Sequence, residues 1–443
     1  MTRHGVLPDH PIPDLAAYLE VGGGSGWTKA MRMQPQQVID EVAASGLRGR
    51  GGAGFPTGTK WRSVVEAADS APPLVCNAAE GEPGTYKDRA VMTRNPYQVL
   101  EGLLIAAHAV VADPVVIATK RRYNREAERL AAARSEMIAA GWTGAEKIAL
   151  ALGPDEYLFG EESALLEVVE GKLPMPRIIP PYMFGLAGTM QHPNPTIVNN
   201  VETLAHVTDI LARGVGDFRS RGTQEAPGTM VFTVVGDVTS PGVYELDLGT
   251  SLATLLDIAG ASDVQAIYSG VSNAVIRPEL VDLPMDFDSF AEAGTGLGSG
   301  GFIVYDHSRC IIDVVASLSR FLAVESCAQC PPCKLHGVEM HERLASLCAN
   351  GGSPNDVAEL RRRCVAVTDG NRCYLPVGHA LVVGSALDAF AGEFESALGA
   401  PHEHDNPVTI PKIDDLDDDT GAVSFDTAYT RKRLDWGYDS ADG

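Results

Sequence analysis

The chain has 443 residues, of which 58 are acidic and 35 are basic, so its formal net charge is −23. A surface of this sign repels phosphate backbones, which argues against a nucleic-acid-binding protein. Hydrophobic residues make up 45% and charged residues 21% of the chain, which excludes general disorder, and the length predicts several domains rather than one core.

No stretch predicts a membrane-spanning helix. The most apolar one, 102–119, is interrupted by His108, Asp113 and Pro114, and it predicts a buried helix followed by a strand. The first residues lack the apolar segment of a signal peptide, so we expect a cytoplasmic protein that does not itself insert into a membrane. In a reducing compartment the eight cysteines are expected to be ligands or buried thiols rather than disulfides.

The first half of the chain alternates short apolar runs with longer helical ones. A lead-in (1–45) with a helix at 35–44 precedes a glycine-rich loop at 46–58. The strands expected after it are 74–78, 114–119 and 147–152, and the helices are 97–111 and 125–140. This alternation predicts an α/β domain with a largely parallel sheet over 46–220.

Three further regions follow a predicted linker at 214–228. A hairpin turning at Ser240-Pro241-Gly242, a helix at 251–259 and one more strand predict a small domain over 228–304. Helical spacing over 311–322, 334–347, 354–366 and 377–398 predicts a helical domain over 305–400. The acidic tail, 401–443, is either a disordered extension or a strap docked on a partner through its aromatic residues (Phe425, Tyr429, Trp436 and Tyr438).

Three cysteines, Cys327, Cys330 and Cys333, stand three residues apart, with Cys373 as the candidate fourth ligand. Such a triplet wraps one corner of an iron–sulfur cubane at little loop cost, whereas paired CxxC motifs are typical of zinc. The pattern therefore favours a [4Fe–4S] cluster, with zinc as the alternative. Cys348 and Cys364 lie in predicted helices, and with Cys76 and Cys310 they are expected to be buried thiols.

Three polar segments accompany the cysteines. The loop SGLRGRGGAGFPTGTKW (45–61) brings glycine backbone and Lys60 within reach of a ring or a phosphate. CNAAEGEPGTYKDR (76–89) follows a predicted strand, where α/β folds place ligands, and GEES (160–163) and NNVET (199–203) each open a helix. Helix capping is the structural alternative for the last two segments.

Together with FGEESALLEVVEGK and ESCAQCPPC, these segments closely resemble the NADH-oxidising flavoprotein subunit of respiratory complex I and of soluble NAD-linked formate dehydrogenases and hydrogenases. The resemblance covers about 14–398. It implies an α/β fold in which an FMN-binding α/β domain is followed by a β-grasp (ubiquitin-like) domain and a helical bundle carrying a [4Fe–4S] cluster. It also implies an NADH dehydrogenase (diaphorase)-type enzyme with FMN, the cluster and NAD(H) as cofactors.

The same resemblance implies the site residues and the partners. Glu82 and Glu162 would be catalytic. The cofactor-binding residues would be Gly49, Gly51, Gly52, Phe55, Lys60, Asn77, Glu80, Gly160, Glu161, Tyr182, Asn199, Asn200 and Thr203. The cluster ligands would be Cys327, Cys330, Cys333 and Cys373. A thioredoxin-like [2Fe–2S] subunit and a further iron–sulfur or catalytic subunit would accept the electrons, because this chain has no second cysteine set for another cluster.

The nucleotide site departs from the family pattern. Ala79 stands where the family has Asp, Ser63 where an aromatic residue is usual, and Ile179 where a basic residue precedes Pro-Pro. The residues after Cys373 also differ. A lost charge-assisted hydrogen bond costs about 1.5–3 kcal/mol. An alternative function is therefore an electron conduit or scaffold that no longer oxidises NADH.

Overall fold

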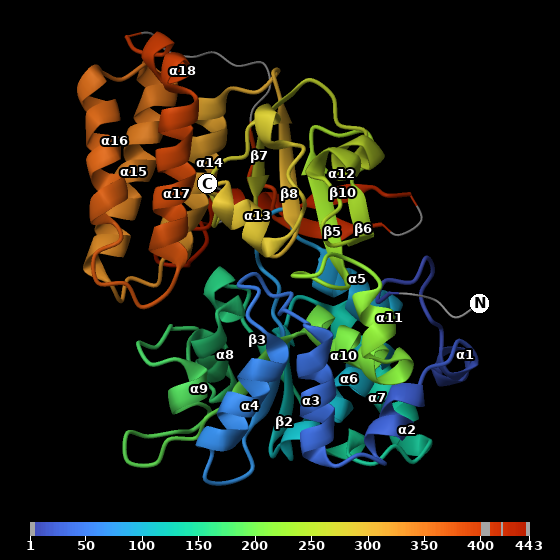
Figure 1. Cartoon of the computed structure of the whole chain (residues 1–443). Helices are drawn as coiled ribbons and strands as arrows, with labels where there is room; N and C mark the ends of the chain where they lie inside the picture. Colours follow the sequence, from blue (N-terminus) through green and yellow to red (C-terminus); the bar gives the residue numbers. More distant parts are fainter. Residues whose placement is uncertain (1–4, 400–407, 418–419, 440–443) are drawn as a thin grey trace. The chain divides into compact units, whose positions relative to one another are not determined.

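The computed structural model describes residues 5–399, 408–417 and 420–439 and divides into two compact units (Figure 1). The first unit comprises Met1–Gly81, Tyr86–Phe232 and Val243–Thr250. The second comprises Glu82–Thr85, Thr233–Gly242 and Ser251–Gly443.

A four-stranded parallel sheet forms the centre of the first unit. Its strands are β1 (Leu74–Ala78), β2 (Val115–Lys120), β3 (Ile148–Gly153) and β4 (Ile197–Asn200), in the order β3-β2-β1-β4. The predicted parallel sheet is confirmed. β1 and β2 are almost wholly buried, which explains why both read as continuous apolar runs. The strand order reverses between β1 and β4, and this is the place where open α/β sheets bind ligands.

Helices cover this sheet. They are α1 (Leu15–Glu20), α2 (Ser25–Ala30), α3 (Pro35–Ser45), α4 (Thr57–Ala67), α5 (Lys87–Arg94), α6 (Pro96–Val110), α7 (Asn124–Ala139), α8 (Glu162–Val169), α9 (Pro181–Phe184), α10 (Val201–Arg213) and α11 (Val215–Arg219). α10 packs against β1, β4 and α6. The backbones of α6 and α10 approach so closely that a Cβ on Gly102 would lie 1.8 Å from the Leu204 carbonyl oxygen.

Two predictions for this unit need correction. The lead-in is not a simple extension, because α1 and α2 precede the predicted helix and α2 packs against α6 and α10. The predicted linker contains α11, whose Phe218 is buried. Both α2 and α11 are too short to form alone, so tertiary contacts rather than local pattern stabilise them.

The second sheet has the strand order β6-β5-β8-β7. β5 (Thr229–Gly236) and β6 (Gly242–Asp247) are the predicted hairpin, and β7 (Val264–Ser269) follows the predicted helix α12 (Leu252–Ala259). The sequence analysis missed β8 (Gly301–Asp306), which pairs parallel with β5 and antiparallel with β7. It also missed the short helix α13 (Phe287–Glu292).

The predicted helices of the second unit are confirmed. They are α14 (Ile311–Glu325), α15 (Pro331–Asn350), α16 (Pro354–Ala366) and α17 (Leu375–Ala389), and α18 (Ala391–Ser396) continues the last predicted helix after a break at Phe390. α14 packs against α15 and α17, and α16 packs against the same two helices (Figure 1). The predicted apolar face of α14 is buried throughout.

The expectation of a disordered tail is wrong for the residues that the structure describes. β9 (Ile413–Leu416) and β10 (Val423–Phe425) pair antiparallel, and a single 3₁₀ turn follows them at Thr427–Arg431. Ile410, Leu416 and Tyr429 are buried. The tail therefore docks on the second unit of its own chain. The parts of the predicted extension at 401–407, 418–419 and 440–443 lie outside the described residues.

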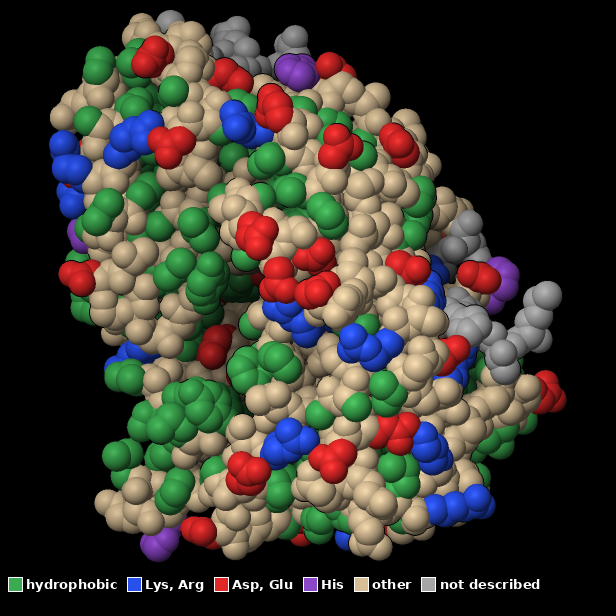
Figure 2. Space-filling view, viewed as in Figure 1, with side chains coloured by type: hydrophobic (Ala, Val, Ile, Leu, Met, Phe, Trp, Pro, Cys, Tyr) green, Lys and Arg blue, Asp and Glu red, His purple; other side chains and the backbone are tan. Residues whose placement is uncertain are grey.

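On the face shown in Figure 2, acidic and basic side chains are interspersed with apolar ones. Within the described ranges, no helix is both long enough and apolar enough to cross a membrane.

Candidate functional site

The carboxyl ends of β1 and β4 bring the predicted asparagines together. In the register of the two strands, Cys76 pairs with Asn199 and Asn77 pairs with Asn200. The Asn77 side chain donates from Nδ2 to the Gly160 carbonyl oxygen at 2.8 Å and accepts at Oδ1 from the Ala79 amide at 3.1 Å. Segments far apart in the sequence thus meet at the switch point of the sheet, which is the edge where a ligand is expected.

The glycine-rich loop joins α3 to α4 and meets this edge. Its neck is closed by the Gly49 amide, which donates to the Phe55 carbonyl oxygen at 2.8 Å. A Cβ on Gly51 would lie 3.2 Å from the Asn200 Cβ, so this backbone passes close to the end of β4. Gly52 has a φ of +124°, a conformation that glycine adopts without strain. The loop therefore presents main chain, not side chains, toward the strand ends.

Lys60 and Trp61, on the first turns of α4, bind β4 from the side. The Lys60 ammonium donates to the Val198 carbonyl oxygen at 2.9 Å and to Glu162 Oε1 at 2.6 Å. Trp61 Nε1 donates to Asn199 Oδ1 at 2.7 Å, and this indole is fully buried. Lys60 and Glu162, predicted from separate motifs, are thus direct partners.

Glu80 carries an unpaired polar atom in this unit. Its Oε1 accepts from the Asp88 amide at 3.1 Å, whereas its buried Oε2 has no hydrogen-bond partner within the described chain. Burial, with a further contribution from the nearby Asp88 carboxylate, raises the pKa of Glu80 to about 8. The protonated carboxyl group at neutral pH can therefore donate a hydrogen bond to a bound group.

Other predicted residues divide between capping and exposure. Glu161 Oε2 accepts from the amides of Ser163 and Ala164 at 3.1 and 2.9 Å, so this carboxylate is the N-cap of α8, as the structural alternative predicted. The Phe55 and Tyr182 side chains are 53% and 52% exposed, and their rings are available for stacking.

A buried ion network next to Asn200 was missed by the sequence analysis. The Lys87 ammonium lies 2.8 Å from Asp88 Oδ1, 2.8 Å from Glu202 Oε2 and 3.3 Å from Asn200 Oδ1, and Asn200 Nδ2 donates to Asp88 Oδ2 at 2.7 Å. Burial alone raises the pKa of Glu202, but the Lys87 cation and His206 outweigh it and lower the value to about 2. The network holds the Asn200 amide in one orientation. Its one sequence signal was that Lys87 and Asp88 lie in the 76–89 motif.

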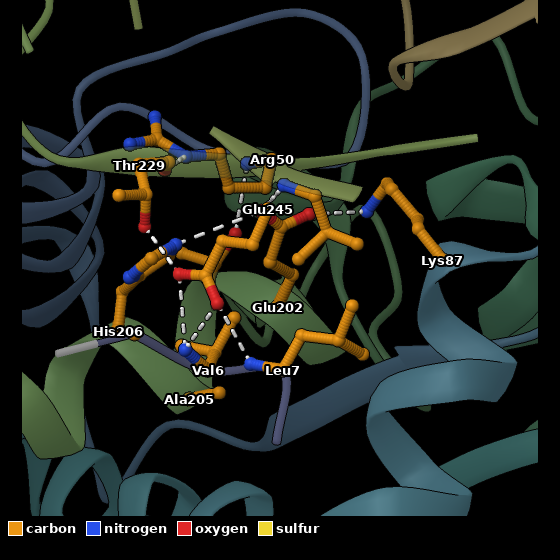
Figure 3. A network of polar contacts seen from close by, with 12 residues as sticks. Val6, Leu7, Arg50, Lys87, Glu202, Ala205, His206, Thr229 and Glu245 are labelled. Carbon is orange, nitrogen blue, oxygen red and sulfur yellow. Dashed lines mark hydrogen bonds and ion pairs between the residues drawn. The ribbon is translucent and has the colours of Figure 1, made fainter. Parts of the chain in front are cut away.

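Arg50 extends this network into the glycine-rich loop (Figure 3). Its amide donates to Thr203 Oγ1 at 2.9 Å, so Thr203 holds the loop backbone. Its fully buried guanidinium donates from Nε to the Thr229 carbonyl oxygen at 3.1 Å. In the same view the Glu245 carboxylate accepts from the amides of Val6 and Leu7.

Glu82 belongs to the second unit. Its Oε1 accepts from the Val271 amide at 2.7 Å and from the Ser272 hydroxyl at 3.1 Å, and a Cβ on Gly270 would lie 2.3 Å from the same oxygen. This carboxylate therefore binds the turn after β7.

The cysteine triplet lies where α14 gives way to α15. Cys330 is the N-cap of α15, and Cys333 lies in its first turn. Ser326 Oγ lies 3.3 Å from Cys333 Sγ, and Gln329 Nε2 donates to Cys327 Sγ at 3.5 Å. Burial raises the pKa of Cys333 to about 11 as a free thiol. Soft thiols with hydrogen-bond donors at two sulfurs fit an iron–sulfur cluster, whose sulfurs proteins commonly hydrogen-bond.

Cys373 lies in the connection between α16 and α17, as predicted, whereas Cys348 and Cys364 lie within α15 and α16. Cys364 Sγ lies 3.7 Å from Met340 Sδ, the environment of a packed thiol. In the part of the chain that the structure describes, no three His, Cys, Asp or Glu side chains are gathered into a preformed metal site.

The three departures from the family pattern lie in different environments. Ala79 is 1% exposed and follows β1 directly, so an acidic group is missing from the interior. Ser63 is exposed on α4, and Ile179 is half-buried before α9. Only the change at Ala79 therefore alters the buried part of the strand edge.

Comparisons with known proteins agree with this site. Residues 42–209 match the Nuo51 FMN-binding domain, residues 313–397 match the NADH-ubiquinone oxidoreductase-F iron-sulfur binding region, and residues 231–262 match the SLBB domain. The second match contains all four candidate ligands.

Relatives cover nearly the whole chain. The second of the F subunits of NADH-quinone oxidoreductase in Rhizobium meliloti (strain 1021) is 37% identical over 408 residues, which are 88% of this chain and 96% of that protein. The corresponding F subunit of Streptomyces coelicolor is 34% identical over 87% of this chain and 88% of that protein. The crystal structure of an NAD+-reducing [NiFe]-hydrogenase in the H2-reduced state superposes with a TM-score of 0.79 and 34% identity, covering 89% of this chain and 68% of that one.

The fold and the matches define an FMN- and iron–sulfur-containing electron-transfer subunit. The chain belongs to the family of the NADH-quinone oxidoreductase F subunits, an oxidoreductase family with NADH as substrate.

Proposed function

We propose that this chain oxidises NADH at an FMN bound by its first unit and passes the electrons to a [4Fe–4S] cluster bound by its second unit. The observation that carries this proposal is the meeting of the glycine-rich loop with Asn77, Asn199 and Asn200 at the switch point of a parallel sheet. When bound, FMN links a two-electron hydride donor to one-electron carriers.

The residues at the strand ends have the chemistry that FMN requires. Close main-chain passage at Gly51 leaves room for a flat ring or a phosphate, which a side chain there would occupy. Lys60 supplies a cation, and Asn77 and Asn199 supply amides fixed by hydrogen bonds. We assign these residues to FMN together with Gly49, Gly52, Gly160, Asn200 and Thr203.

The nicotinamide nucleotide is assigned to residues that carry exposed rings or carboxyl groups. Phe55 and Tyr182 offer stacking surfaces, and protonated Glu80 offers a donor in place of the acidic group missing at Ala79. Glu82 and Glu162 remain the proposed catalytic carboxylates. Glu161 contributes through the N-terminus of α8, which its side chain caps.

The cluster is assigned to Cys327, Cys330, Cys333 and Cys373. We propose that 46–220 is the FMN-binding domain after the lead-in 1–45, that 228–304 is a β-grasp domain, and that 305–400 is a helical bundle built around the cluster, followed by the tail 401–443. Subunit naming among the relatives supports a place in a multisubunit complex. We propose a cytoplasmic location there, a thioredoxin-like [2Fe–2S] neighbour and a further iron–sulfur or catalytic subunit.

The test is an anaerobic titration of the purified chain with NADH and no other reductant. The flavin absorbance should bleach, and iron and acid-labile sulfide should be present. A preparation that holds FMN and iron but is not reduced by NADH would favour the conduit or scaffold function, for which the buried Ala79 is the specific observation. A colourless preparation containing zinc would refute both functions.

A further inference from the structure

The C-terminal residues 427–439, which we call the clasp, bind both sides of the cysteine triplet. Trp436 Nε1 donates to the Val324 carbonyl oxygen at 2.9 Å, on the last turn of α14. Lys334, the residue after Cys333, donates from Nζ to the Leu434 carbonyl oxygen at 2.8 Å. One segment thus contacts the chain before Cys327 and the chain after Cys333.

The Lys334 ammonium joins the same three elements. Besides Leu434 it donates to the carbonyl oxygens of Ala323 and Ser326, at 2.9 and 3.1 Å. An ammonium group has three protons, and here each has an acceptor: one at the end of α14, one immediately before Cys327 and one in the clasp. Loss of the clasp leaves this cation without one of its three acceptors.

A buried anchor fixes the clasp two residues before the first cysteine. Glu325 Oε1 accepts from the Tyr429 hydroxyl at 2.9 Å and from Lys432 Nζ at 2.7 Å, and the Lys432 and Glu325 side chains are each 1% exposed. The Tyr429 ring packs on Phe321, with centroids 5.3 Å apart.

Arg320 adds a second attachment one turn earlier on α14. Its Nη2 donates to the Thr430 and Lys432 carbonyl oxygens at 2.8 and 2.9 Å. The clasp therefore contacts α14 over two turns through side-chain and main-chain groups, which is more than an incidental surface contact.

We propose that the clasp is a positioning element for the iron–sulfur cluster: it holds the loop from Ser326 to Lys334 in its ligating shape and restricts the loss of iron from it. This inference rests on the cluster assigned in the proposed function. Groups that orient metal ligands typically change metal affinity 10- to 100-fold when they are mutated. Hydrogen bonding and solvent exposure around the sulfurs also set the electronic state of such clusters.

The test compares the full-length holoprotein, purified without oxygen, with the double variant Tyr429→Phe/Trp436→Phe. This variant removes two hydrogen bonds to the α14 end while keeping aromatic side chains. The rate of cluster bleaching by an iron chelator should rise about tenfold, and the EPR line shape of the reduced cluster should change. A loss of general stability alone would not alter that line shape.

Tyr268→Phe is the matched control. Tyr268 is fully buried in the same unit, on β7, and its hydroxyl has no hydrogen-bond partner within the described residues. This variant should keep both the wild-type bleaching rate and the wild-type spectrum.

Two further variants complete the test. A chain that ends at Asp426 lacks the whole clasp and should lose iron at least as fast as the double variant. Lys334→Met should act similarly, and combining it with the truncation should add little, because both remove one tether. Wild-type bleaching rate and line shape in the double variant would overturn the clasp while leaving the proposed function intact. A wild-type chain without iron would refute the cluster itself.

Discussion

The Lys87 ammonium lies 2.8 Å from the Glu202 carboxylate, and both side chains are fully buried. This pair joins the first helix after β1 to the first helix after β4. Because Lys87 also contacts Asp88 and Asn200, it neutralises two carboxylates beside an amide that we assign to FMN. The contact therefore connects the stability of the first unit to the shape of its ligand edge.

Replacing Lys87 should be costly. Lys87→Met leaves Glu202 and Asp88 without their buried cation, and breaking such a pair typically costs about 3–5 kcal/mol. We expect that loss in denaturant unfolding, together with FMN released on gel filtration. Lys29→Met is the control, because Lys29 is 41% exposed and an exposed ion pair contributes about 0–1 kcal/mol. A loss below ~1 kcal/mol for Lys87→Met would contradict the role of the network.

Glu80 should make stability depend on pH. Its folded-state pKa, about 8, is raised above the unfolded value of ~4.3, so its contribution is fully present below that unfolded value and is lost as pH rises toward 8. Glu80→Gln removes this titration. The melting temperature of the variant should therefore rise relative to wild type between about pH 5 and pH 8, with a slope of at most about 1.4 kcal/mol per pH unit.

The control for that experiment is Glu66→Gln, at an exposed position on α4. Its melting temperature should follow the wild-type curve. A constant offset between Glu80→Gln and wild type across the same pH range would show that Glu80 ionises normally in the folded protein.

Glu245 should hold the N-terminal segment. Its carboxylate accepts from the Val6 and Leu7 amides and from the Thr229 hydroxyl, and hydrogen bonds to a charged group contribute about 1.5–3 kcal/mol each. Glu245→Ala should expose the first residues to limited proteolysis and lower the melting temperature. Glu225→Ala, at an exposed position, should do neither. Equal cleavage of both variants would refute this attachment.

The choice of fourth ligand can be tested directly. Cys373→Ser should lose or distort the cluster, because Cys373 lies in a connection between helices, whereas Cys348→Ser should keep the iron content and the EPR signal, because Cys348 lies within α15. The reverse result would move the ligand to Cys348.

The elements that could be predicted from the sequence are those with a strong local pattern. β1 to β3 and α14 to α17 show continuous apolar runs or helical spacing, so their positions needed no knowledge of the fold. β8 was missed because its apolar and aromatic residues follow a glycine-rich run that looked like the end of a domain. Its pairing with β5 joins residues far apart in the chain.

The site shows the same division. Lys60, Asn77 and Asn199 stand in conspicuous motifs, whereas the Lys87–Glu202 pair depends on a contact across 115 positions of the chain. The clasp was hidden for a related reason. Its acidic composition resembles that of solvated segments, and Glu325, which anchors it, looks in the sequence like one more charge at the end of a helix.

The division of the chain has a practical consequence for anyone who wishes to express its parts. The polypeptide passes from one unit to the other after Gly81, Thr85, Phe232, Gly242 and Thr250. No single cut yields either unit intact, because any fragment lacks a stretch that belongs to its own interior or carries one foreign to it. Flavin-binding and cluster-binding halves should therefore be sought by co-expression of overlapping pieces or by circular permutation, not by simple truncation.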